Sequence, residues 1–353
     1  MKSALLTTIL ALFTITAQAE DAAQAFRAEC GKMAAEAEAA GGITVPGSDG
    51  WLFLARELRH ISVGQFWGDK AAEVSRATNP EHQDPLPAIV DYNEQLKKLG
   101  IELILVPVPP KAIIYPDKLT SAAAPDEGKP PARLDTAHQE FYKLLREKGV
   151  NVIDLTEEFL PLRLLPQDGK NKIYCQGDTH WSGLACVRTA QLIAKELKTR
   201  PWYNNIERRT IEMVERSVQI NGDLAREMPT KPPAETLHLR FVGTQQAGLP
   251  KPLPPDEASP VILLGDSHTL VFHSGDDMHT TGAGLADQLA YELGFPVDLI
   301  GVRGSGARPA RVNLYRRGRH NADYFAGKKA LIWCFSAREF TESSGWGIVP
   351  VTR

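Results

Sequence analysis

Two short segments carry side chains that could form a nucleophilic site. One segment, residues 175–182, contains Asp178 and His180, and the other places Ser267 directly after an apolar run. A serine hydroxyl is a poor nucleophile at neutral pH unless a base accepts its proton and a third group holds that base. We therefore predict acyl transfer, with Ser267 as nucleophile, His180 as base and Asp178 as the carboxylate that orients the imidazole.

Each of these residues also has a structural interpretation. Asp178 could cap a helix that begins near residue 182, and Ser267 could be the N-cap of a helix after its strand. We interpret Asp266 as a residue that stabilises the turn, and His268 as a neighbour that points away from the nucleophile. The combination of serine, histidine and aspartate, rather than any one of them, favours catalysis.

A repeated pattern of amphipathic helix, glycine and apolar strand surrounds these segments. Predicted helices at 89–99, 134–148 and 285–293 each end at a glycine, which readily adopts the left-handed C-cap conformation. A further helix is predicted at 183–198, with Ser182 as its N-cap. The runs predicted as strands are 101–106, 150–155, 261–264, 297–300 and 330–335.

Apolar strands that follow helices are typical of a parallel sheet buried on both faces. We therefore predict an α/β fold, a three-layer α/β/α sandwich with a mostly parallel sheet. Ligand sites of open α/β sheets lie beyond the carboxyl ends of the strands. Ser267, the glycine-rich turn 301–306 and the segment 336–339 all fall at such ends, which supports a common site.

The first nineteen residues resemble an export signal. Lys2 precedes a mostly apolar run, 4–16, and residues 17–19 have the small-x-small pattern of a cleavage site. The run is short and rich in threonine for a membrane span. We predict cleavage after Ala19 and a periplasmic location; a retained inner-membrane anchor is the alternative.

The remaining chain is long enough for one large α/β domain or two modest ones. We divide it into an N-terminal helical segment, 20–43, and one domain, 44–353, with a Pro-rich loop or small insertion at 228–260. The net charge is −3, and no basic patch is interleaved with aromatic residues. Both features argue against nucleic acid as a partner.

Four cysteines raise the question of disulfides in an exported protein. Cys175 and Cys186 flank the turn with Asp178, and a bridge between them would clip this turn to the next helix; the pairing stays open at this point. Cys334 lies in an apolar run and fits a buried thiol. No pair has the spacing of a zinc knuckle, so no metal is expected.

The residues around the serine resemble the SGNH hydrolase superfamily. Gly265-Asp266-Ser267 looks like its first block, and residues 298–304 look like its second, which implies that Gly304 lends its backbone N–H to the oxyanion hole. Residues 331–339 stand where the third block would lie, but Arg338 takes the place of the usual asparagine.

That departure points to a narrower family, the periplasmic alginate O-acetyltransferases (AlgX/AlgJ-like proteins). Their Asp-x-His pair also precedes the serine, and the length of this chain resembles the AlgJ-like branch. Six segments resemble the family in order: 49–53, 106–116, 177–181, 221–224, 265–267 and 333–340.

The resemblance implies acetyl transfer through an acetyl-serine onto hydroxyls of an exopolysaccharide such as alginate. Gly304 N–H, Ser267 N–H and Arg338 would stabilise the oxyanion, and one such donor contributes roughly 3–4 kcal/mol in the transition state. The acetyl donor would come from a membrane-bound O-acyltransferase, and no cofactor is expected.

Other residues of the resemblance could contact the polymer. Trp181 and Tyr115 could line a sugar groove, although buried aromatics are commoner than exposed platforms. Arg303 could attract an anionic polysaccharide or belong to a solvated helix face, and Arg338 could instead pair on the surface with a neighbouring glutamate.

Two other functions stay open. A polysaccharide deacetylase or carbohydrate esterase would use the same serine, histidine and aspartate, and would differ only in accepting water. A non-catalytic polysaccharide-binding scaffold of an export machine is the third hypothesis. The complete set of three residues counts against the scaffold, because a degenerate site has no reason to keep all three.

Overall fold

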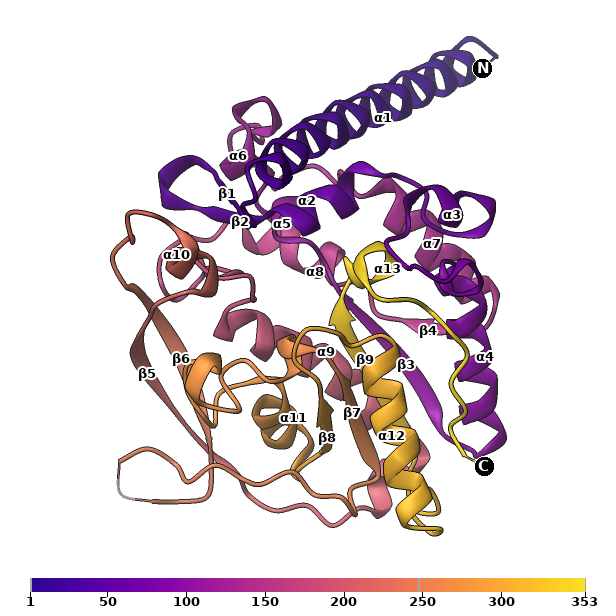
Figure 1. The fold of residues 1–353 in the computed structure, drawn as a ribbon, viewed down its shortest axis with the longest axis vertical. Helices are drawn as coiled ribbons and strands as arrows, with labels where there is room; N and C mark the ends of the chain where they lie inside the picture. Colours follow the sequence, from indigo (N-terminus) through magenta and orange to yellow (C-terminus); the bar gives the residue numbers. More distant parts are fainter. Residues whose placement is uncertain (1, 247, 353) are drawn as a thin grey trace.

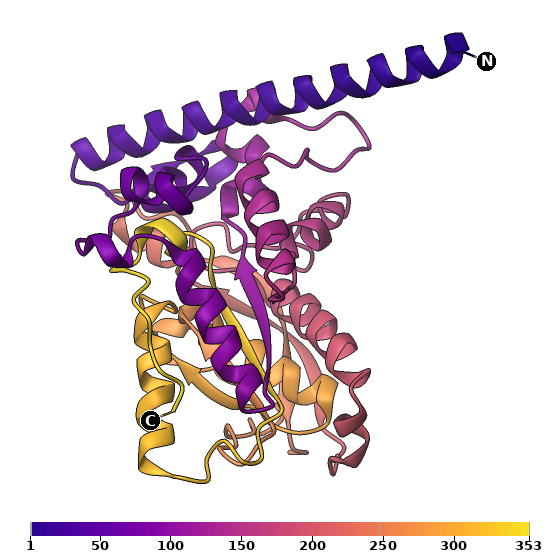
Figure 2. The same cartoon turned by 90° about the vertical axis from the view of Figure 1, so that its right-hand side faces the viewer.

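The computed structural model describes residues 2–246 and 248–352, and the side chains from residue 20 onward within those ranges. The chain begins with one long helix, α1 (Lys2–Ala39), whose N-terminal end extends away from the body (Figures 1 and 2). The predicted signal segment, 1–19, lies outside the residues described with side chains. Among the residues that are so described, no helix is long and apolar enough to cross a membrane.

A five-stranded sheet forms the centre of the molecule (Figure 1). The strands lie in the order β4-β3-β9-β7-β8, and every neighbouring pair is parallel. Their bounds are Glu102–Val108 (β3), Asn151–Val152 (β4), Val261–Gly265 (β7), Asp298–Gly301 (β8) and Ala330–Ser336 (β9). The predicted parallel sheet is confirmed, and β9, the last strand in sequence, lies between β3 and β7.

Helices cover both faces of this sheet, on opposite sides in Figure 2. Leu103 and Leu105 of β3 pack with α4, α7 and α12, whereas Ile104 and Val106 pack with α8, α9 and α11. The helices are α4 (Pro85–Lys98), α7 (Thr136–Glu147), α8 (Leu155–Leu162), α9 (Gly183–Lys198), α11 (Leu285–Leu293) and α12 (Arg308–His320). Alternation along the strands therefore builds the predicted α/β/α sandwich.

The ends of two helices follow their sequence signals closely. α9 and α11 have the predicted bounds, and Gly294 ends α11 in the left-handed conformation, with φ 83°. Ser182 is the N-cap of α9, but its hydroxyl donates to Lys172 O instead of capping the helix. The predicted strand 150–155 is shorter than expected, because α8 begins at Leu155.

Two antiparallel pairs lie outside the main sheet. A hairpin joins β1 (Thr44–Pro46) to β2 (Leu52–Leu54), and β5 (Glu212–Ile220) pairs with β6 (Glu235–Gly243). The segment 228–260, predicted as a Pro-rich loop or small insertion, contains β6. The short helices are α2 (Ala55–Ser62), α3 (Ala71–Val74), α5 (Lys111–Ile114), α6 (Pro116–Leu119), α10 (Asp223–Glu227) and α13 (Glu339–Glu342).

All four cysteines are free and buried. The bridge considered between Cys175 and Cys186 is not formed, and Cys175 Sγ donates to Trp181 O at 3.4 Å within its own turn. Burial raises the pKa of the Cys175 thiol well above its ordinary value, and burial also raises that of Cys186. Both side chains thus behave as small apolar residues of the core.

Candidate functional site

The structure brings together the serine, histidine and aspartate that the sequence singled out. Ser267 begins the short turn after β7, and Asp178 and His180 lie in the turn that precedes α9. Ser267 Oγ lies 2.7 Å from His180 Nε2, and His180 Nδ1 lies 2.6 Å from Asp178 Oδ1. The Nδ1–H therefore donates to the carboxylate, and Nε2 is left to accept the serine proton.

The surroundings make His180 a stronger base than an isolated imidazole. Burial by itself lowers the pKa of His180, but the charge and hydrogen bond of Asp178 raise it above 6.5, with smaller contributions from Asp223 and Asp266. Burial by itself would raise the pKa of Asp178, yet His180 and His279 hold it well below its ordinary value. The carboxylate thus stays ionised beside the imidazole.

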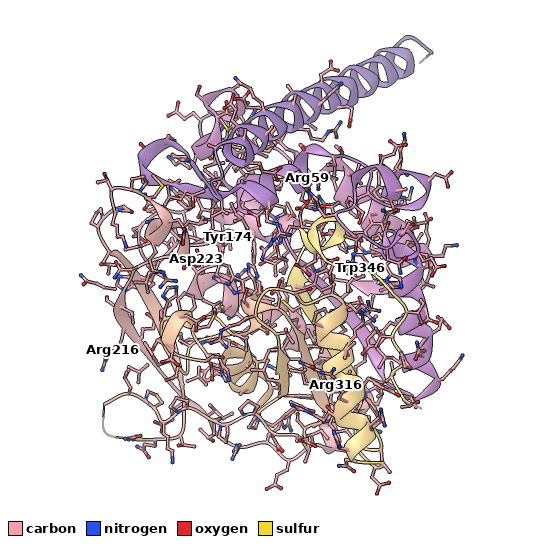
Figure 3. All side chains as sticks on the ribbon, in the orientation of Figure 1. Arg59, Tyr174, Arg216, Asp223, Arg316 and Trp346 are labelled. Atoms are coloured by element: carbon pink, nitrogen blue, oxygen red, sulfur yellow. The ribbon has the colours of Figure 1, made fainter. Side chains whose placement is uncertain are left out.

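A second layer of groups holds the Asp178 turn. Asp178 Oδ2 accepts the Asp223 N–H at 2.8 Å and lies 3.0 Å from His279 Nε2. Lys111, only 1% exposed, donates from Nζ to Asp178 O at 2.5 Å and to Leu52 O at 2.8 Å. Asp223 begins α10 and is labelled in Figure 3.

Sequence reasoning assigned no role to Lys111, Asp223 or His279. The first two fall inside segments that resemble the family, 106–116 and 221–224, so the sequence held a signal for them. His279 follows a glycine- and aspartate-rich turn, which marks a loop but not a partner for Asp178.

A pocket of about 650 Å³ opens beside Ser267 and His180. Gly304, at the end of the turn after β8, lines it with φ 86°. Among the described residues, no hydrogen-bond acceptor is found for the Ser267 N–H or the Gly304 N–H. Both groups are therefore available to a developing negative charge.

The predicted arginines also line this pocket. Arg338 Nη1 donates to Ser336 Oγ at 2.9 Å and lies 3.9 Å from Glu57 Oε1. These contacts fix the guanidinium, on a side chain that is 13% exposed, at the carboxyl end of β9. Arg303 is half-exposed at the rim and forms a two-point ion pair with Asp277, with the shorter contact at 2.7 Å.

Trp181 and Tyr115, in contrast, do not form a sugar groove. Both side chains are fully buried and absent from the pocket lining. The Trp181 indole N–H donates to His268 O at 3.1 Å, and Tyr115 stacks on Trp51 with ring centroids 4.0 Å apart. The prediction for these two residues is wrong: they are core residues that support the turns around the site.

Glu339 is a buried acid that the sequence did not single out. It lines the pocket, and Ser305 Oγ donates to Glu339 Oε2 at 2.5 Å. Burial raises its pKa to about 7, although Arg338 and Ser305 act in the opposite direction. Glu339 therefore fastens the turn that carries Gly304 to the end of β9.

Three of these side chains also resemble a metal site. Potential ligand atoms of Asp178, His180 and Asp223 lie within 4.8 Å of one another. Hydrogen bonds account for this proximity, because Asp178 Oδ1 binds the imidazole and Asp223 accepts the N–H and hydroxyl of Thr179 at 2.7 and 2.6 Å.

A second hollow, of about 670 Å³, lies between α1 and the segment 120–134. Alanine and proline dominate its lining, which includes none of the residues discussed above. Volume therefore does not distinguish the two hollows, whereas the polar groups around Ser267 do.

The chain is similar to known proteins in sequence and in fold. Residues 44–336 match the family model described as "SGNH hydrolase-like domain, acetyltransferase AlgX". Over 188 residues the chain is 25% identical to the probable alginate O-acetylase AlgJ of Pseudomonas aeruginosa, covering 53% of this chain and 41% of that protein. Over 125 residues it is 31% identical to the alginate biosynthesis protein AlgX of Pseudomonas fluorescens, covering 34% of this chain and 24% of that protein.

Two solved structures share the fold. The O-acetyltransferase domain of Pseudomonas putida AlgJ superposes with a TM-score of 0.59 at 20% identity, covering 84% of this chain and 92% of that one. Pseudomonas aeruginosa AlgX superposes with a TM-score of 0.56 at 18% identity, covering 86% and 65%. Since the family model spans most of the chain, this protein belongs to the family of SGNH hydrolase-like acetyltransferase domains represented by AlgX.

Proposed function

We propose that the protein is a periplasmic O-acetyltransferase that moves an acetyl group, through an acetyl-Ser267 intermediate, onto hydroxyls of an exopolysaccharide such as alginate. The hydrogen-bonded chain of Ser267, His180 and Asp178 at the wall of a pocket carries this proposal. The relatives are named as an alginate O-acetylase and an alginate biosynthesis protein. These names support acetyl as the transferred group and a polysaccharide as its acceptor.

The first half-reaction acetylates the enzyme. Ser267 Oγ attacks the acetyl carbonyl carbon of the donor while His180 Nε2 accepts the hydroxyl proton. The negative charge that develops on the carbonyl oxygen is stabilised by Ser267 N–H and Gly304 N–H, with the Arg338 guanidinium nearby. When the donor's C–O bond breaks, His180 returns the proton to the leaving oxygen, and acetyl-Ser267 remains.

The second half-reaction repeats these steps with a different nucleophile. His180 Nε2 accepts a proton from a sugar hydroxyl, whose oxygen attacks the acetyl carbon. The bond to Ser267 Oγ then breaks, the serine regains the proton, and the acetylated sugar leaves. Asp178 stabilises the imidazolium in both halves, because its carboxylate holds the Nδ1–H throughout.

The partners follow from this chemistry. A membrane-bound O-acyltransferase would supply the acetyl donor, and the export signal proposed for residues 1–19 would bring the enzyme to the periplasm. Arg303 would contact the acceptor at the rim, where its guanidinium is half-exposed.

Transfer and hydrolysis can be separated by following both products. The protein is incubated with p-nitrophenyl acetate, with and without alginate oligosaccharides, and acetate and acetylated sugar are both measured. We expect slow acetate release, faster donor turnover with acceptor, acetylated sugar as product, and an acetyl group on Ser267 by mass spectrometry. Ser267→Ala should lose every activity.

Two outcomes would contradict the proposal. Fast acetate release from an acetylated polysaccharide, with no transfer to any acceptor, would make the protein an esterase. Retained activity in the Ser267→Ala protein would remove the covalent mechanism.

A further inference from the structure

A second histidine binds the aspartate of the site. His279 lies on the segment 271–283, which follows the Ser267 turn and returns to the Asp178 turn. Its side chain is only 6% exposed, and its Nε2 lies 3.0 Å from Asp178 Oδ2, the oxygen that does not face His180. Asp178 is therefore held between two imidazoles, one on each carboxylate oxygen.

The backbone at His279 has an uncommon conformation. Its φ and ψ are 73° and −55°, and the Thr280 N–H donates to Met278 O at 3.0 Å. These values describe a γ-turn with positive φ at its centre, a rare and strained form. Strained residues persist only where their surroundings enforce them, and they concentrate at functional sites. The strained backbone of His279 and its contact with Asp178 thus both indicate a functional role for this residue.

The surrounding segment enforces this conformation. Among the described residues, three of the four non-glycine positions with positive φ lie here: Phe272, Asp276 and His279. Phe272 N–H donates to Met278 O and Ala283 N–H donates to Phe272 O, both at 2.9 Å. The segment is a tightly bonded support that presents one imidazole to the Asp178 carboxylate.

We propose that His279 is a positioning residue, whose Nε2–H fixes the Asp178 carboxylate so that Oδ1 faces His180 in a chain of four side chains, Ser267–His180–Asp178–His279. This inference rests on the proposed function. Without His279, the Asp223 N–H is the donor that remains on Oδ2. The carboxylate then has more freedom to rotate away from the imidazole that it must orient.

Three substitutions separate the imidazole's hydrogen bond from the strain of its backbone. His279→Ala and His279→Gly both remove the donor, but glycine also accepts positive φ without strain. His279→Gln keeps an N–H at a comparable reach. We expect Ala and Gly to lower kcat for p-nitrophenyl acetate by about ten- to a hundredfold, the effect of one hydrogen bond to a charged group, with KM little changed.

The kcat of His279→Gln and the unfolding temperatures of the Ala and Gly variants decide whether His279 positions Asp178 or only stabilises the segment. Under the proposal, His279→Gln recovers most of kcat, and His279→Gly stays as impaired as His279→Ala although it unfolds at a higher temperature. If His279 only stabilises the segment, activity instead follows stability, and Gly exceeds Ala. That result would overturn the proposal.

The pH profile supplies a readout that packing alone does not move. Without His279 the carboxylate of Asp178 faces His180 less well and raises the pKa of the imidazole less, so the acid limb of kcat/KM, which reports His180, should move to lower pH. The other groups near His180, Asp223, Asp266 and the His268 ring at 5.0 Å, are unchanged by the substitution. An unmoved acid limb would count against positioning.

His273 offers a matched control on the same segment. Its Nδ1 lies 2.9 Å from Asp287 Oδ2, so His273→Ala removes a comparable histidine–aspartate contact that does not involve Asp178. We expect the acid limb of this variant to stay at the wild-type position. An equal shift in His273→Ala and His279→Ala would overturn the proposal.

A double-mutant cycle tests whether His279 acts through Asp178. In an Asp178→Asn background, His279→Ala should have little further effect on kcat; an undiminished loss there would contradict the inference. Ser267→Ala separates a failure of this inference from a failure of the proposed function. If Ser267→Ala is inactive while the His279 variants are fully active, only this inference fails, whereas an active Ser267→Ala protein would remove the proposed function and this inference with it.

Discussion

The site contains two turns with the same pattern, Gly-Asp-x-His, at 177–180 and 265–268. In each turn, Oδ1 of the aspartate accepts the backbone N–H of the histidine at 2.9 Å and also binds its Nδ1, at 2.6 Å in the first turn and 3.1 Å in the second. The local structure is therefore nearly identical, yet the first turn presents its histidine to the site and the second presents the residue before its histidine.

The surroundings of each turn create this difference. Asp178 Oδ2 binds His279 and the Asp223 N–H, whereas Asp266 Oδ2 accepts the Ser336 N–H, at 2.7 Å. Burial lowers the pKa of His268. Asp266 raises this pKa but does not offset the effect of burial, because the nearby His180 and Arg338 lower it further. The pKa of His180 is raised instead. One sequence pattern thus yields an imidazole of raised pKa in one place and a core imidazole of lowered pKa in the other.

The largest expected contrast lies between the two histidines. His180→Ala removes the base and should lower kcat on the order of 10,000-fold, because the serine loses its proton acceptor. His268→Ala removes packing beneath the serine turn and should stay within about a hundredfold of wild type. Steady-state kinetics with p-nitrophenyl acetate measures both, and equal losses would show that the turns are not functionally distinct.

The two aspartates should differ in the quantity they affect most. Asp178→Asn should lower kcat on the order of 10,000-fold, because the imidazolium loses its counter-charge and tautomer control. Asp266→Asn removes a charge that binds the Ser336 N–H at the end of β9. It should lower the free energy of unfolding by about 1–3 kcal/mol. Urea denaturation beside kinetics checks the pair; a more stable Asp266→Asn protein would contradict this assignment.

The sequence predicted the parts of this site that depend on local pattern. Apolar runs placed the parallel strands, a glycine stop marked the end of α11, and Ser182 marked the start of α9. Asp178 and His180 were identified in the segment 175–182, and Ser267 at the end of a strand. The periodic patterns and the short motifs both depend on residues that are close in sequence, so they can be recognised in one sequence alone.

The remainder depends on packing between distant segments. His279 reaches Asp178 only because a strained loop returns to the first turn, and no periodicity records such a return. Trp181 and Tyr115 were wrongly placed in a groove, because the burial of an aromatic in a loop depends on what covers it. Glu339 lies next to Ser305 only after β8 and β9 are arranged around β7.

A smaller effect should appear in the pH dependence of the rate. His180 must be neutral to accept a proton, and Asp178 raises its pKa above 6.5. Activity should therefore rise with pH through a midpoint above 6.5, and Asp178→Asn should move this midpoint down, since it removes the charge that favours imidazolium. Profiles of kcat/KM from pH 5 to about 9 test the sign; an upward shift would contradict the pairing.

The smallest expected effect concerns the free energy of unfolding and involves Glu339, on which the charge of Asp266 in the second turn acts. Burial raises the pKa of Glu339 from 4.5 to about 7, so the folded protein holds this proton more tightly than the unfolded chain. Its stabilising contribution is complete below about pH 4.5 and is lost as the pH rises to about 7, a change of about 3 kcal/mol.

Glu339→Gln stays neutral and keeps an acceptor for Ser305, so the variant should gain stability relative to wild type between pH 5 and pH 8. Urea denaturation at both pH values measures this gain, with Glu227→Gln, an exposed carboxylate of the same pocket, as control. A stability difference that is the same at pH 5 and pH 8 would show that Glu339 is already ionised in the folded protein, and that the turn bearing Gly304 is fastened by a charged carboxylate.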